Sequence, residues 1–298
     1  DEGFMQKNGL ERFNTLIKLY VLHKIIDLRK QISEWKSEGL SVGLVPTMGG
    51  LHNGHRSLIK LASKKCDRVI VSIFINPTQF GDDEDFETYP QTQKSDITLI
   101  SEAGGDAAFI PNVSEMYPRG FSTKVSVIGL TNMLCGASRP GHFDGVTQVV
   151  AKLLNQVSAD MAFFGEKDWQ QLTIIKRLVR DLDIPTKIVN VATVRDEFGL
   201  ALSSRNSYLN SSQLEIARKL SSVLQMTAYN IASGGYSSVE CAQAMKILLN
   251  SGFDKIDYIE CRDSHSLEPI ERTTEDECRI FAAAYIDNIR LIDNHIVV

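Results

Sequence analysis

Residues 45–55 read Val45-Pro46-Thr47-Met48-Gly49-Gly50-Leu51-His52-Asn53-Gly54-His55 and stand between two different hydrophobic patterns. The preceding apolar run, Val42 to Val45, is typical of a buried parallel strand, and the following apolar spacing predicts a helix over 54–65. The segment is therefore expected to be a strand-to-helix turn. Glycines there let a ligand approach the backbone closely, and the helix N-terminus favours an anion.

The two histidines of this turn, His52 and His55, add nitrogen donors whose charge can change near neutral pH. Together with the glycines they indicate a nucleotide triphosphate at the carboxyl edge of a parallel sheet. A structural explanation stays open from this segment alone, because both rings could simply cap local backbone. A zinc site is disfavoured, since no cysteine lies nearby to complete a tetrahedral set of ligands.

Strand and helix patterns alternate through the first two hundred residues, which predicts an α/β fold with a doubly wound parallel sheet of Rossmann-like type. The predicted strands are 42–45, 69–75, 107–110, 161–164 and 187–194, and the predicted helices are 28–38, 54–65, 91–103, 147–157 and 169–182. We expect 125–130 to form a further strand or edge ribbon. We expect the glycine-rich residues 136–145 to lack regular structure.

The pattern changes after Val194. Helices are predicted over 212–233 and 238–251, and strands over 256–262, 279–286 and 289–293. We therefore predict three regions: an unassigned N-terminal extension over 1–27, a nucleotide-binding Rossmann-like domain over 28–194, and a smaller C-terminal α+β domain over 195–298.

The composition narrows the class of partner. The chain has 298 residues and a net charge of −5, which disfavours nucleic acid, because binding to its phosphates selects a basic surface. No stretch approaches the ~20 apolar residues of a membrane span. The five cysteines are scattered without a C-x-x-C pair, as in a reduced cytoplasmic protein. We expect small-molecule substrates, and neither nucleic acid nor a membrane as partner.

Two polar segments follow predicted strands and are expected at the same sheet edge. Gln79 follows the second strand, and its amide suits a hydroxy acid, although a polar turn is the simpler explanation of that segment alone. Lys167 could reach a triphosphate as a point charge, and Asp168 could accept from a ribose hydroxyl or cap the helix. Gln171 lies one helical turn beyond, on the same side. An ordinary charged first turn is the alternative.

Further charged residues are candidates for binding anions or a metal. Residues 202–206 combine two hydroxyls with the Arg205 guanidinium, a set that suits phosphate, although a solvated loop explains it as well. Arg139 is another anion-binding candidate, whereas His142 is expected only to cap a turn. Asp96 is a magnesium candidate, directly or through water, and the acidic run 82–85 is expected to be a solvated loop. No Ser-His-Asp or Cys-His arrangement stands out.

In combination, these segments closely resemble the pantothenate synthetase (pantoate–β-alanine ligase) family, of the H-x-G-H nucleotidylyltransferase superfamily. The matching blocks are Pro46 to His55, Phe74 to Phe80, Tyr89-Pro90, Gly136 to Phe143, Phe164 to Gln171, Leu202 to Asn206 and Leu291 to Asn294. The chain departs from the family pattern at Gly50 and Trp169, and neither change removes a polar group.

The resemblance implies condensation of pantoate with β-alanine by a cytoplasmic, homodimeric ligase that uses ATP and Mg²⁺ and forms pantoyl adenylate. It places catalytic roles on His52, His55, Lys167 and Arg205, with His55 as proton donor. It assigns pantoate to Gln79 and Gln171, and β-alanine to Gln79. It assigns ATP to Met48, Gly49, Gly50, Leu51, His52, Asn53, Gly54, His55, Gly165, Glu166, Lys167, Asp168, Val194, Leu202, Ser203, Ser204 and Arg205. The C-terminal domain is expected to close over the nucleotide as a lid.

Three other functions remain possible at this stage. Another nucleotidylyltransferase would keep the two histidines but need not have both Gln79 and Gln171. A fragment of a class I aminoacyl-tRNA synthetase is disfavoured by the acidic balance. A nucleotide sensor without turnover is disfavoured because no catalytic position is visibly lost.

Overall fold

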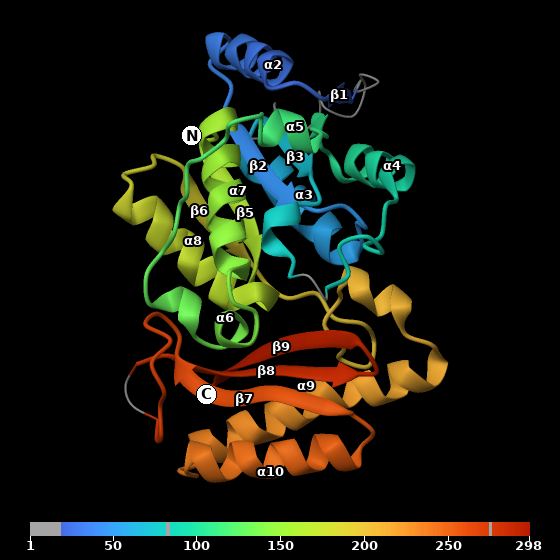
Figure 1. Cartoon of the computed structure of the whole chain (residues 1–298), viewed down its shortest axis with the longest axis vertical. Coiled ribbons are helices and arrows are strands. Elements are labelled where there is room, and N and C mark those ends of the chain that lie inside the picture. Colours follow the sequence, from blue (N-terminus) through green and yellow to red (C-terminus); the bar gives the residue numbers. More distant parts are fainter. Residues whose placement is uncertain (1–18, 82–83, 274–275) are drawn as a thin grey trace, which may run out of the picture.

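The computed structural model describes residues 19–81, 84–273 and 276–298, and it arranges them around one large and one small sheet (Figure 1). The predicted extension 1–27 is thus described only from residue 19 onward. Asp82 and Asp83 of the acidic run lie outside the described residues.

The large sheet has six strands, all parallel, in the order β1-β4-β3-β2-β5-β6. They are β1 (Tyr20–Leu22), β2 (Val42–Thr47), β3 (Arg68–Ile73), β4 (Ala107–Phe109), β5 (Met161–Gly165) and β6 (Lys187–Val191). From β2 the chain adds β3 and β4 on one side, and it then crosses over to add β5 and β6 on the other. The carboxyl ends of β2 and β5 therefore form the topological switch point, where sheets of this type bind ligands.

Helices cover both faces of this sheet, because side chains along each strand alternate between two buried sides. Leu44 and Ile70 pack in the core under α2 (Ile25–Ser37), α7 (His142–Val157) and α8 (Trp169–Asp181). Val45 and Val71 belong to the core under α3 (Asn53–Lys65) and α4 (Gln93–Ala103). The shorter elements are α5 (Val113–Met116), α6 (Cys135–Ser138) and the 3₁₀ turns η1 (Pro77–Gln79), η2 (Leu130–Asn132), η3 (Glu166–Asp168) and η4 (Ser204–Tyr208).

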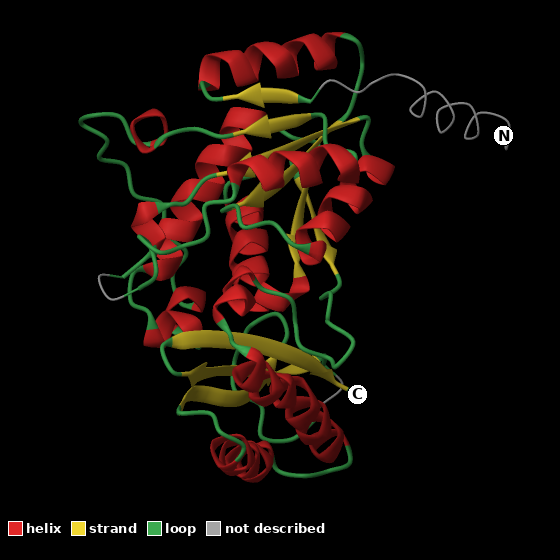
Figure 2. Ribbon diagram, turned by 90° about the vertical axis from the view of Figure 1, so that its right-hand side faces the viewer, coloured by secondary structure: helices red, strands yellow, loops and turns green. Residues whose placement is uncertain are grey.

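The small sheet lies below the large domain in Figure 1, and Figure 2 shows the same layering from the side. Its strands β7 (Lys255–Asp263), β8 (Cys278–Ile286) and β9 (Ile289–Val297) are antiparallel. Helices α9 (Ser211–Ala232) and α10 (Ser237–Asn250) share a core with one face of this sheet. Tyr258, Phe281 and Ala283 of the other face join the core of the large domain, so the two domains share buried surface.

The predicted fold class, a doubly wound parallel sheet with a smaller C-terminal α+β unit, is confirmed. The region left unassigned contributes more than predicted, since β1 pairs with β4 and α2 begins at Ile25. The predicted strand over 125–130 is absent from the described structure. Side chains of α7 hold this segment instead: Gln148 accepts from the Val125 N–H, and the Thr147 hydroxyl donates to its carbonyl.

The expectation that residues 136–145 lack regular structure is wrong. Helix α6 ends at Ser138 and α7 begins at His142, so only a short bend separates two helices. Gly141 forms that bend with φ of +83°, a conformation that glycine adopts without steric cost.

Candidate active site

The turn between β2 and α3, residues 46–55, lies at the switch point of the sheet and is called the signature turn below. Gly49 and Gly50 both have positive φ, +89° and +61°. The Asp96 carboxylate, 2% exposed, accepts hydrogen bonds from the backbone N–H groups of Gly50 (3.1 Å) and Leu51 (2.9 Å). A buried acceptor from α4 thus fixes the path of the signature turn.

Both histidines of the signature turn cap the helix that follows and also line a cavity. The Nδ1 of His52 accepts from the Gly54 N–H (3.1 Å), and the Nδ1 of His55 accepts from the His52 N–H (3.3 Å). A neutral imidazole that accepts at Nδ1 carries its proton at Nε2. The two structural hydrogen bonds therefore leave each ring with an Nε2–H donor for a ligand.

The imidazoles of this pair are neutral at physiological pH. Burial, followed by the nearby Lys167 ammonium, lowers the pKa of His52 to about 4. Burial, followed by His52 and Lys167, lowers the pKa of His55 to about 3. The sequence suggested groups that change charge near pH 7, whereas this environment makes both rings uncharged hydrogen-bond donors.

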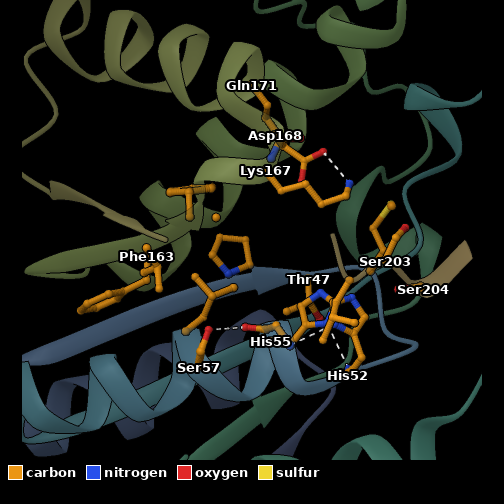
Figure 3. A pocket seen from close by; sticks show the side chains of 18 of the residues that line it. Thr47, His52, His55, Ser57, Phe163, Lys167, Asp168, Gln171, Ser203 and Ser204 are labelled. Carbon is orange, nitrogen blue, oxygen red and sulfur yellow. Dashed lines mark hydrogen bonds and ion pairs between the residues drawn. The ribbon is translucent and has the colours of Figure 1, made fainter. Parts of the chain in front are cut away.

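The opposite wall of the cavity comes from η3 and the start of α8, which follow β5. Figure 3 shows Lys167 and Asp168 across the cavity from His52 and His55. The Lys167 ammonium lies 3.7 Å from the Asp168 carboxylate, which forms no capping hydrogen bond to α8. Of the two roles considered for Asp168, the helix cap is therefore excluded, and its carboxylate stays available to a ligand.

Gln79 enters the same site from η1. Its side chain is buried, its Oε1 accepts from the Asn76 amide (3.1 Å), and its Nε2 lies 2.9 Å from the Met48 sulfur. His142 does more than cap its own turn, because its Nδ1 bonds to the Gln79 carbonyl at 2.7 Å. Asn76 also donates to the Gly145 carbonyl (3.0 Å), so three segments hold Gln79 in place.

The loop that leads into the C-terminal domain closes the third side. The Ser204 hydroxyl donates to the Gly50 carbonyl at 3.0 Å, which ties η4 to the signature turn. Arg205 makes a two-point ion pair with Asp85, with distances of 2.9 and 2.6 Å. Arg139 pairs in the same way with Glu84. The described part of the acidic run therefore binds two arginines of the site. This differs from the expectation that the run is a solvated loop.

Two neighbouring cavities form between these walls, with volumes of about 230 and 420 Å³. Of the predicted residues, those lining the first are Met48, His52, Gly54, His55, Gln79, Gly165, Lys167, Asp168, Gln171, Val194, Leu202, Ser203, Ser204 and Arg205. The second adds Arg139 and His142, together with residues of β9 such as Ile289. The cavities share Met48, Gln79, Lys167, Asp168, Gln171, Ser203 and Arg205. Ligands in the two cavities would therefore touch.

Five of the residues predicted to bind ATP do not line either cavity. Gly49, Gly50 and Leu51 form the backbone of the signature turn, and Asn53 is exposed at the start of α3. Glu166 accepts from the Asn190 amide at 2.7 Å, which directs its carboxylate toward β6.

The charged groups favour a phosphate-bearing ligand over a protein-bound metal. Within residues 19–81, 84–273 and 276–298, no cluster of three or more His, Cys, Asp or Glu side chains could hold a metal ion. Both oxygens of Asp96, the predicted magnesium residue, accept from backbone N–H groups of the signature turn. Its contacts are those of a positioning residue. Magnesium usually reaches such sites on the substrate's phosphates, with most of its ligands from phosphate and water.

Sequence reasoning missed several residues of this site. Asn76, whose amide bonds to Gln79, and Thr47, which lines the first cavity, both lie close in sequence to predicted positions. Asn294 of β9 donates to the backbone of η3 from more than a hundred residues away. Asn76 adjoins a predicted strand end and could have been found, whereas a contact over that separation has no local signal.

None of the described helices is long and apolar enough to cross a membrane. An uncharged histidine pair, a lysine and two glutamines at the switch point of a doubly wound sheet define an α/β enzyme that binds a nucleotide beside a second, polar substrate.

Comparison with known proteins gives the particular family. A family model described as "Pantoate-beta-alanine ligase" matches residues 20–296. A pantothenate synthetase of Dinoroseobacter shibae is 51% identical over 92% of this chain and 98% of its own, and one of Paramagnetospirillum magneticum is 49% identical over 93% and 97%. The chain therefore belongs to the pantoate–β-alanine ligase family, and it is a ligase that joins pantoate to β-alanine with ATP.

Solved structures agree with this assignment. The crystal structure of pantothenate synthetase from Thermus thermophilus matches with a TM-score of 0.87 and 40% identity, over 93% of this chain and 99% of that one. The pantoate–β-alanine ligase of Francisella tularensis, complexed with β-γ ATP and β-alanine, matches with a TM-score of 0.80 and 37% identity, over 93% and 97%.

Proposed function

We propose that this ligase works in two steps within the paired cavities, through a pantoyl adenylate. A carboxylate oxygen of pantoate attacks the α-phosphorus of ATP, and the bond to the β-phosphate breaks to release pyrophosphate. The uncharged amine of β-alanine then attacks the acyl carbon, AMP leaves with the electrons of the C–O bond, and the nitrogen releases one proton to water as the amide forms. The observation that carries this proposal is the set of residues that the two cavities share, because it lets an acid and a nucleotide meet.

The proposed roles follow from the charges of the site. The Nε2–H groups of His52 and His55 donate to phosphate oxygens, and the Lys167 ammonium stabilises the charge that develops on the departing pyrophosphate. Bound phosphate raises the pKa of both imidazoles, because a nearby anion favours their charged form. His55 therefore becomes a proton donor only after the nucleotide has bound.

The remaining groups position the substrates. Gln79 and Gln171 donate to the pantoate carboxylate and hydroxyls, and Gln79 also reaches β-alanine. Asp168 accepts from the ribose, and Val194 contacts the adenine. Residues 202–205 and the C-terminal domain form a lid, with a boundary near Val194, that keeps water from the reactive adenylate. Arg205 exchanges its Asp85 partner for the β- and γ-phosphates when ATP binds.

We also infer that the enzyme works with Mg²⁺ as a homodimer in the cytoplasm. Magnesium would be held by the ATP phosphates, where it would supply charge neutralisation. The family resemblance supports the dimer. A reducing compartment is consistent with five cysteines that are all buried free thiols.

Isotope exchange between pyrophosphate and ATP tests the two-step route. With pantoate present and β-alanine absent, we expect exchange that depends on pantoate, because the adenylate forms reversibly. His55→Ala should abolish it, whereas Arg56→Ala, which removes only a surface pair with Glu102, should leave the rate near wild type. AMP formation without any exchange would contradict a free adenylate intermediate and indicate a concerted reaction.

A further inference from the structure

The turn that carries Lys167, η3, is held in place by hydrogen bonds from the C-terminal domain. The Asn294 amide of β9 donates to two successive backbone carbonyls of η3, those of Glu166 (2.9 Å) and Lys167 (3.0 Å). Its Oδ1 accepts from Arg279 at 3.0 Å, and the side chain is 4% exposed. A buried amide with all these partners is held in one orientation.

A second pair of contacts fixes the other end of the same turn. The Arg279 guanidinium lies 3.5 Å from the ring centroid of Trp169, the first residue of α8. The indole N–H of Trp169 donates to the Ser264 carbonyl of the C-terminal domain at 2.8 Å. Lys167 and Asp168 therefore stand between two anchor points that both belong to the C-terminal domain.

The carbonyl contacts have a direct consequence for the Lys167 side chain. Element η3 is a three-residue 3₁₀ turn, too short to be stabilised by its own hydrogen bonds. The direction in which its side chains leave the backbone depends on what holds its carbonyls. Asn294 holds the carbonyl of Lys167 itself, so it fixes the backbone position from which the side chain enters the cavity.

We propose that Asn294 is a positioning residue that holds Lys167 toward the triphosphate. ATP binding then depends on how the C-terminal domain packs against η3. This inference rests on the proposed contact between Lys167 and phosphate. The Asn294 side chain acts entirely through the backbone of η3 and through Arg279.

A double-mutant cycle on ATP affinity tests this inference. Titration calorimetry of the full chain would compare wild type, Asn294→Ala, Lys167→Ala and the double variant. We expect Asn294→Ala to weaken ATP binding about tenfold, because a displaced contact loses most of its strength. The double variant should bind no more weakly than Lys167→Ala alone, since Asn294 acts through that lysine. Additive losses, or an Asn294→Ala affinity within twofold of wild type, would overturn the inference.

Two further variants separate positioning from general destabilisation. Asn294→Asp keeps an acceptor for Arg279 but has no N–H for the carbonyls, so it should weaken ATP binding like Asn294→Ala and replaces that variant if it does not fold. Ser237→Ala removes a buried hydroxyl that bonds to the Ile270 carbonyl inside the C-terminal domain, and it should leave ATP affinity within twofold. Equal weakening in Ser237→Ala would overturn the inference.

The outcomes also distinguish this inference from the proposed function. Failure of wild type to bind ATP would contradict both. Normal ATP affinity in Lys167→Ala would contradict the proposed contact between Lys167 and phosphate. It would also contradict the positioning role of Asn294, which rests on that contact. Wild-type binding with a clear loss in Lys167→Ala but additive behaviour of the pair would contradict only the role of Asn294.

Discussion

At the scale of single residues, Asp96 shows how a buried carboxylate can shape a binding turn without touching the ligand. Its oxygens accept from the N–H groups of Gly50 and Leu51, and Oδ1 also accepts from the Thr92 hydroxyl at 3.0 Å. These N–H groups point away from the cavity, since they point to α4. The carboxylate thus selects which backbone groups of the signature turn remain for the nucleotide.

Asp96→Asn should reveal this role. The amide replaces one acceptor oxygen by a donor, which then faces a backbone N–H, so we expect a loss of about 2 kcal/mol in the free energy of unfolding. Pantothenate formation should fall about tenfold at saturating Mg²⁺ because the turn is displaced. The Mg²⁺ concentration for half-maximal activity should stay unchanged. Urea unfolding and a magnesium titration of activity measure the two effects.

The matched control for that experiment is Glu102→Gln, also on α4. Glu102 makes only a partly exposed pair with Arg56, so its loss should change stability by less than about 0.5 kcal/mol. An Asp96→Asn variant with wild-type stability and a raised magnesium requirement would instead make Asp96 a metal ligand.

The candidate site could be predicted only in part from the sequence at this scale. His52, Gln79 and Lys167 follow strand patterns, and parallel strands bring their carboxyl ends to one edge, so their meeting in one cavity was predictable. The bond from Asp96 to the signature turn crosses 45 residues, and no local pattern records it. The low pKa values of the histidines were also unpredictable, because burial depends on the whole fold.

At the scale of elements, the start of α7 packs directly on η1. A Cβ placed on Gly145 would overlap the Thr78 carbonyl oxygen and lie 2.6 Å from the Cα of Gln79. The Asn76 amide bridges the same two elements through the Gly145 carbonyl. A missing side chain therefore allows η1 to approach α7 and so places Gln79.

Gly145→Ala should separate these two elements. We expect the added methyl group to push η1 away, to cost about 1–3 kcal/mol of stability, and to raise the KM for pantoate more than the KM for ATP. Ala151→Gly on the same helix is the control, since it costs about 1 kcal/mol through helix propensity and leaves this contact intact. Steady-state kinetics compare the two, and equal changes in both KM values for Gly145→Ala would argue against a role in placing Gln79.

Glycines also explain where sequence reasoning failed at this scale. Strand and helix alternation predicted most elements of the large domain, because the two periods differ clearly. Residues 136–145 were expected to be irregular because glycine usually marks loops. Gly136 and Gly145 instead lie inside helices, where a Cβ would overlap the carbonyls of Thr131 and Thr78. A single sequence does not distinguish a glycine needed for close packing from one needed for a bend.

At the scale of the whole molecule, one buried ion pair ties the first residue of the C-terminal domain to its last strand. Arg195, just after the predicted boundary, donates to both carboxylate oxygens of Asp293 in β9, at 2.7 and 2.9 Å. Burial alone raises the pKa of Asp293, but His295, whose Nε2 lies 3.6 Å from the carboxylate, and the hydrogen bonds from Arg195 outweigh it and hold the pKa below its ordinary value. Asp293 precedes Asn294 in the chain, so the pair also sets the strand that reaches η3. The predicted boundary near Val194 adjoins this contact, although nothing in the sequence linked Arg195 to β9.

Arg195→Met should therefore loosen β9 and the turn η3 that β9 holds. The change leaves the Asp293 carboxylate, 2% exposed, without its main partner, and we expect a loss of about 3–5 kcal/mol at pH 7. Relative to wild type at the same pH, the loss should shrink as the pH falls toward 4, because protonation removes the unpaired charge. Hydrogen exchange should accelerate in β9 and η3, while β2 and β3 keep their protection.

The control for this prediction is Arg218→Met, which breaks a more exposed pair with Asp196. It should cost no more than about 1 kcal/mol and leave the hydrogen exchange of β9 and η3 unchanged. A similar small cost for Arg195→Met would mean that apolar packing, rather than this ion pair, holds β9 in place.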